Sequence, residues 1–134
     1  MKSMKPAKRP RLAMPAVSEQ MKAWSAALAD ELTSWPRVGA RTFFGFSALY
    51  RGERIFALLP RTRAMGTPNT LAFKFESLTP QLRTRLDGDP RIGTTEMRAA
   101  RWQTFELSSD SDLHDALDWL GLAYEAAGKP KKSR

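Results

Sequence analysis

The sequence predicts an α+β domain with a mostly antiparallel sheet, an N-terminal and a C-terminal helix packed on it, and a short helix before the last strand. Three observations support this class. Apolar residues recur with helical spacing near both ends of the folded segment, alternating segments flank a turn at Gly52, and a threonine–proline pair precedes the last strand. Strands and helices without a regular βαβ order indicate α+β rather than α/β architecture.

The first helix is expected over residues 19–34, with Ser18 as its N-cap. Its apolar residues follow helical spacing and form one stripe: Met21, Trp24, Leu28, Leu32 and Trp35. Pro36 restricts the residue before it and ends the helix. A first strand is expected from Val38 to Phe43.

Residues 46–50 and 54–59 predict a β-hairpin around residues 51–53, where Gly52 supplies the positive φ of a tight turn. We expect one face to carry Phe46, Ala48, Ile55 and Ala57, and the other to carry Leu49, Phe56 and Leu58. Apolar residues on both faces indicate strands that are covered on both sides or lie centrally in the sheet.

After a loop over residues 60–70, residues 71–76 alternate, with Leu71, Phe73 and Phe75 pointing inward. Thr79 and Pro80 predict the start of a short helix that ends at residues 87–90. Residues 91–100 fit no single element, and residues 102–107 predict a strand.

The last helix is expected to run to about Ala127, beginning after a capping pair of Ser109 and Asp112. Its core stripe is Leu113, Ala116, Leu117, Leu120, Tyr124 and Ala127. Three further apolar residues, Trp119, Leu122 and Ala126, lie off this stripe. A helix that is apolar on two sides is buried on two sides or faces a partner, so we expect a homodimer or protein contact through these three residues.

The positive charge is concentrated at the two ends of the chain. The net charge is +8, with five basic and no acidic residues in 1–11 and four basic residues in 129–134. We therefore expect a flexible basic arm over 1–17, one domain over 18–128, and a basic tail over 129–134. The absence of cysteine and of a signal-like apolar segment favours a cytoplasmic protein, and no membrane partner is expected.

Within the body, residues 37–101 are rich in arginine and residues 102–128 carry six acids and no base. These two segments pair internally, or they present faces of opposite charge. If the arginines gather, they would bind an anion or a nucleic-acid backbone. The candidate contacts are Arg61, Arg63, Arg83, Arg85, Arg98 and Arg101. A smaller possibility is an anion pocket formed by Arg61, Arg63 and Asn69 in the 60–70 loop.

The sequence offers little for catalysis. It has no cysteine and one histidine, His114, which argues against thiol chemistry, paired-histidine metal sites and histidine-based acid–base schemes. Asp87-Gly88-Asp89 lacks the remaining ligands of a calcium loop, and no glycine-rich phosphate loop is present. We therefore expect no catalytic residue, no metal and no cofactor.

Three short motifs carry a resemblance to known families. They are Trp35-Pro36-Arg37-Val38, Phe44-Gly45-Phe46 and residues 101–107, with Tyr124 near the end. Over residues 19–127 the chain resembles the small bacterial luciferase-like domain family. It is more distantly similar to TfoX N-terminal and MmcQ/YjbR-like domains, the last of which are associated with DNA binding. The resemblance implies a compact α+β fold.

The chain departs from the luciferase-like pattern at three positions: Arg37 and Phe46 stand where glycine is usual, and Ala123 where serine is usual. Together with the residue analysis, the sequence favours a non-enzymatic binding or adaptor domain that contacts itself or another protein through the last helix. The alternative is a double-stranded DNA-binding domain that uses the basic arms and the arginine-rich middle.

Overall fold

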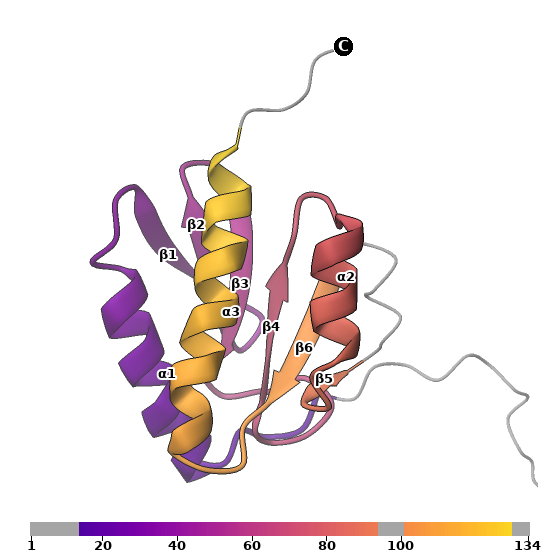
Figure 1. Ribbon diagram of the computed structural model, residues 1–134. Coiled ribbons are helices and arrows are strands. Elements are labelled where there is room, and N and C mark those ends of the chain that lie inside the picture. Colours follow the sequence, from indigo (N-terminus) through magenta and orange to yellow (C-terminus); the bar gives the residue numbers. More distant parts are fainter. Residues whose placement is uncertain (1–13, 94–100, 130–134) are drawn as a thin grey trace, which may run out of the picture.

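The computed structural model describes residues 14–93 and 101–129 and confirms the α+β class. A six-stranded antiparallel sheet carries its helices on one face (Figure 1). The elements are α1 (Glu19–Leu32), β1 (Val38–Phe43), β2 (Phe46–Arg51), β3 (Arg54–Pro60), β4 (Thr70–Lys74), α2 (Pro80–Asp87), β5 (Ile92–Gly93), β6 (Trp102–Glu106) and α3 (Ser111–Gly128). The strand order is β1-β2-β3-β4-β6-β5.

Two of the three expected helix caps are confirmed. The Ser18 hydroxyl accepts a hydrogen bond from the Met21 N–H at 3.0 Å, and the Thr79 hydroxyl accepts one from the Leu82 N–H at 3.1 Å. Of the two side-chain hydrogen bonds expected from the capping pair before α3, only the one accepted by Asp112 forms. The Asp112 carboxylate accepts from the backbone N–H groups of Ser108 and Ser109, but the Ser109 hydroxyl bonds to Ser111.

The β2–β3 hairpin is confirmed, but its predicted faces are wrong for Ala57 and Leu58. A register shift after Leu49 places Leu49 opposite Ala57 and Tyr50 opposite Ile55, so Phe56 is an extra residue on β3. This bulge moves Ala57 to the helix-covered face and Leu58 to the opposite face. The turn itself is as expected, because Gly52 has a φ of +64°.

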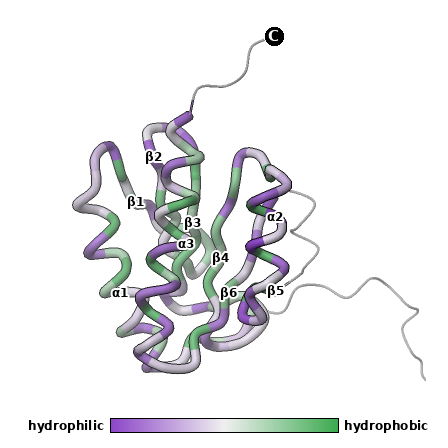
Figure 2. Tube along the Cα trace, in the orientation of Figure 1, coloured by the Kyte–Doolittle hydropathy of each residue, from purple (hydrophilic) through white to green (hydrophobic). Residues whose placement is uncertain are grey.

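Helix α3 lies in the middle of the helical layer, between α1 and α2 (Figure 1). Its apolar residues therefore have neighbours on two sides as well as the sheet beneath them. Figure 2 shows hydrophobic colouring along α3 and along the strands behind it. This position accounts for a helix that is apolar beyond one stripe.

The sheet also buries apolar residues on the face opposite the helices, as the two-sided pattern predicted. This second cluster contains Phe46, Ala48, Leu58, Met65 and Ala72, bordered by Tyr50, Ile55 and Trp102.

The expected end of the flexible N-terminal arm at residue 17 is too late. Ala16 forms an antiparallel bridge with Arg63, and Val17 is buried. Residues 1–13 of the expected arm and residues 130–134 of the expected tail lie outside the described residues. Within the described part of the chain, no helix is long and apolar enough to cross a membrane.

Candidate functional site

The three residues expected to contact a partner are placed differently from one another. Trp119 is only 6% exposed. Its indole ring stacks on Phe73 with centroids 5.9 Å apart, and its Nε1 donates to Asp89 at 3.1 Å. Trp119 therefore belongs to the interior of this domain, whereas Leu122 and Ala126 are half-buried and reach a groove.

This groove, of about 870 Å³, lies between α2 and α3. It brings Leu122 and Ala126 together with two of the predicted anion contacts, Arg85 and Arg101. The other residues that line it are Arg54, Phe75, Glu76, Ser77, Thr79, Gln81, Leu82, Glu125 and Lys129. Residues proposed for two separate roles thus border one amphipathic surface, which we call the α2–α3 groove.

The other predicted anion contacts do not join this groove. Arg83 is exposed on α2, and Arg98 lies outside the described residues. Arg61 and Arg63 are exposed at the far end of the sheet, where their backbone N–H groups donate to Gly45 O at the β1–β2 turn.

Asn69 has a role beside the one expected in an anion pocket with Arg61 and Arg63. At the N-cap of α1, its side-chain oxygen accepts a hydrogen bond from the Ser18 hydroxyl. The two arginines have exposed side chains beside the β1–β2 turn. At that turn Phe44 is 81% exposed and has a φ of +48°.

Arg91 pairs with acids of the C-terminal segment, as the internal-compensation alternative predicts. It makes two bonds of 2.9 Å to Asp89 and approaches Asp112 at 2.8 Å and Asp115 at 3.1 Å. Hydrogen bonds from Arg91 lower the pKa of Asp89, and backbone N–H donation from Ser108, with Arg91 adding to it, lowers the pKa of Asp112. This network ties the segment after α2 to the start of α3. Asp89 also accepts from Trp119, in the middle of that helix.

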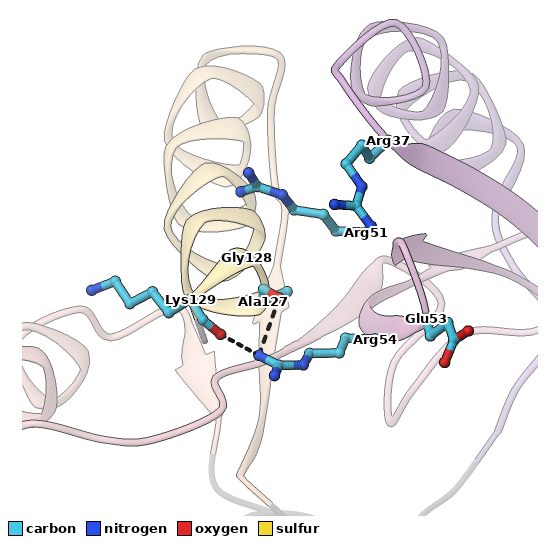
Figure 3. Close-up of a pocket in the computed structure, with 7 residues that line it drawn as sticks. All are labelled: Arg37, Arg51, Glu53, Arg54, Ala127, Gly128 and Lys129. Carbon is cyan, nitrogen blue, oxygen red and sulfur yellow. Dashed lines mark hydrogen bonds between the residues drawn. The ribbon is translucent and has the colours of Figure 1, made fainter. Parts of the chain in front are cut away.

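A second pocket, of about 350 Å³, lies at the end of α3 and was not predicted (Figure 3). Arg37, Arg51 and Arg54 line it from the β1 and β2–β3 region. We call it the arginine pocket. Arg51 and Arg54 donate to the last carbonyls of α3, which has no basic residue in its own last turn. The sequence signal was present in Arg51-Gly52-Glu53-Arg54, but only the fold shows that this turn reaches the helix end.

The remaining titratable candidates form no metal centre in the described residues. His114 is exposed and lies 3.8 Å from Asp118 on the same helix. Asp89, from the Asp87-Gly88-Asp89 turn, is bound to Arg91 and Trp119.

Comparison of the chain with protein-family models, with curated proteins and with solved structures gave no match. The resemblance to luciferase-like and YjbR-like domains therefore stays a prediction.

Proposed function

We propose that the chain is a non-enzymatic binding module whose α2–α3 groove holds a short acidic segment of a protein partner, anchored by apolar side chains. The observation that supports it is the composition of the groove, whose lining combines four apolar residues with four cationic and two acidic ones. Amphipathic grooves of this kind recognise peptide segments through apolar anchors and complementary charge.

The apolar part of the groove is contributed by three elements. Phe75 follows β4 and is buried, while Leu82 of α2 and Leu122 of α3 are half-buried and still accessible. Ala126, one turn after Leu122, leaves room beside α3. An apolar partner side chain placed here would remove the accessible parts of Leu82 and Leu122 from water, at about 25 cal/mol for each Å² buried.

The charge of the groove favours an acidic partner. Arg54, Arg85, Arg101 and Lys129 border it, against the two carboxylates Glu76 and Glu125. Both carboxylates have basic neighbours: Glu76 lies 4.0 Å from Lys74, and Glu125 lies 3.9 Å from Arg51. The basic excess would attract a carboxylate-bearing segment and repel a basic one.

The experiment is fluorescence anisotropy with a labelled peptide of Asp, Glu, Leu and Phe, with a peptide carrying Lys in place of the acids as its counterpart. Arg101→Glu and Leu122→Glu should each weaken binding of the acidic peptide at least tenfold, because one removes a cation and the other places a charge among the apolar side chains. The matched control is Arg83→Glu, which makes the same charge change on α2 outside the groove. Equal binding of both peptides, or equal loss in the control, would contradict the proposal.

Self-association of the chain is the alternative to a contact between α3 and another protein. Trp119→Ser cannot test it, because this side chain is buried and its loss would destabilise the domain. Sedimentation velocity of wild type and Leu122→Ser at micromolar concentration is the suitable measurement. A wild-type dimer that dissociates in the variant would assign the groove to a second copy of the chain.

Double-stranded DNA binding is the second candidate function, supported by the other end of the sheet. Arg61 and Arg63 are exposed there, next to the β1–β2 turn that carries the exposed Phe44. Arginines beside an exposed apolar tip suit a phosphate backbone and a groove. Binding of a duplex should then weaken steeply with salt, and Arg61→Gln with Arg63→Gln should reduce the salt slope by about two. Absence of binding at low salt would exclude this function.

A further inference from the structure

The arginine pocket contains more positive charge than the capping of α3 requires. Arg37, Arg51 and Arg54 line it, and Glu53 is the one acidic residue among its lining residues. In Figure 3 the side chains of Glu53 and Lys129 extend away from the three guanidinium groups. None of the three guanidinium groups is paired with Glu53, the one carboxylate of the lining.

Two of these groups are held in place by the end of α3. Arg51 donates to Tyr124 O at 3.1 Å and lies 4.1 Å from the centroid of the Tyr124 ring. Arg54 donates through Nη1 to Ala127 O at 3.3 Å and to Lys129 O at 2.6 Å. Each guanidinium has five N–H donors, so both retain donors after these bonds. Side chains that are already ordered lose less entropy when they bind a ligand.

Arg37 is not used by the fold in this way. Among the described residues its guanidinium makes no hydrogen bond or ion pair, although its backbone oxygen accepts from the Gly52 N–H at 3.0 Å. Its backbone has a φ of +67°, the left-handed conformation that glycine adopts more readily. Arg37 is exposed, so its guanidinium is free to bind a ligand, and residues at such strained backbone positions cluster at functional sites.

Two glycines leave the space that the arginines occupy. A Cβ on Gly52 would lie 2.8 Å from the Arg37 guanidinium, and a Cβ on Gly128 would lie 2.3 Å from that of Arg51. Gly128 lines the pocket, and Gly52 lies in the turn between two of its arginines, Arg51 and Arg54. Their lack of side chains lets both guanidinium groups approach the backbone.

The negative features near the pocket are weaker than this positive charge. The end of α3 carries a partial charge of about −0.5, and Arg51 and Arg54 already bond to its carbonyls. Glu125 lies 3.9 Å from Arg51 and is mostly exposed. Planar guanidinium groups bind oxyanions through paired N–H bonds, and a phosphate offers enough oxygens for several of them.

We propose that the arginine pocket binds a phosphate group, either as inorganic phosphate or as a small phosphomonoester. This pocket adjoins the α2–α3 groove and shares Arg54 and Lys129 with it, but Arg37 and Arg51 line the arginine pocket alone. The phosphate would bind Arg37 and the remaining donors of Arg51 and Arg54.

The test is titration of the full chain at low ionic strength with sodium phosphate and with ribose 5-phosphate, followed by calorimetry and by the backbone amide NMR signals of Gly52 and Gly128. Arg37→Gln should weaken binding about tenfold or more, because it removes a charged donor that the fold does not use. The matched control is Arg83→Gln, an exposed arginine of α2 outside the pocket.

Saturable binding that is weakened by Arg37→Gln and unchanged by Arg83→Gln would support the site. Tighter binding of the sugar phosphate than of inorganic phosphate would identify a phosphomonoester as the ligand, and equal binding would identify the free ion. Absence of saturation up to about 10 mM, or equal affinity of wild type and Arg37→Gln, would overturn the proposal whatever the result with the acidic peptide.

Discussion

Arg91 holds the segment after α2 to the start of α3, so its replacement should destabilise the domain in a pH-dependent way. The perturbation is Arg91→Met, which keeps an apolar stem near Phe105, over which the guanidinium lies 4.9 Å from the ring centroid. The variant leaves two carboxylates without their cation. The side chains of Asp89 and Asp112 are only 11% and 15% exposed.

The expected loss follows from the contacts of Arg91. Hydrogen bonds to charged groups contribute about 1.5–3 kcal/mol each, and Arg91 makes such bonds to both Asp89 and Asp112. Its contact with the exposed Asp115 adds little. Because the Arg91 side chain is itself 30% exposed, water replaces part of what is lost. We expect the free energy of unfolding at pH 7 to fall by about 3 kcal/mol.

The pKa values of Asp89 and Asp112 fix the sign of the pH dependence. Both are lowered in the folded state from the ordinary value of 3.8. Their contribution to stability is therefore complete above that value and is lost as the pH falls through the lower, folded-state pKa. Wild type should lose this part of its stability in acid, whereas Arg91→Met, which lacks the pairing, should lose much less of it.

The assay is urea unfolding followed by tryptophan fluorescence at pH 7 and at about pH 2. The difference between wild type and Arg91→Met should shrink at the lower pH, and Arg83→Met should match wild type at both. An equal difference at the two pH values would show that Arg91 acts through packing rather than charge. A difference below about 0.5 kcal/mol at pH 7 would refute the reasoning altogether.

Three further predictions concern turns and one buried hydroxyl. Phe44→Asn should raise the free energy of unfolding by about 0.5–1 kcal/mol, because Asn-Gly suits the two positive φ angles of this exposed turn; a loss of stability in thermal unfolding would contradict it. Gly45→Ala should lower it by about 1–2 kcal/mol, since its φ is +88° and the new Cβ would lie 2.8 Å from Arg63; an unchanged melting temperature would show that the turn adapts. Tyr124→Phe should cost about 1 kcal/mol in urea unfolding by removing the 2.9 Å bond to Pro36 O, and no loss would mean that water replaces it.

The sequence was a good guide to the elements whose signals are local. Ser18 and Thr79 are caps that act within three residues, and both were found where expected. The bulge at Phe56 was not predictable, because counting outward from the turn at Gly52 assumes an unbroken register. One extra residue on β3 is enough to exchange the faces of Ala57 and Leu58.

The candidate sites depended on contacts between distant residues, which the sequence does not specify. The apolar character of α3 predicted a second contact beside its core stripe, but could not distinguish packing inside the domain, as at Trp119, from exposure in a groove, as at Leu122. The arginine pocket was missed for a related reason. Arg37 and Gly128 are separated by most of the chain, and only the position of α3 over the hairpin brings them to one pocket.

The termination of α3 by arginines of another segment has a consequence for how the domain assembles. The Arg51 guanidinium and the Tyr124 carbonyl that it reaches are 73 positions apart, and the same separation applies to Arg54 and Ala127. A synthetic peptide covering 111–129 would lack these donors and fray at its C-terminal turn. The last turn of α3 can therefore become fully ordered only once the β2–β3 hairpin is in place. Its completion is thus a late and non-local event in folding.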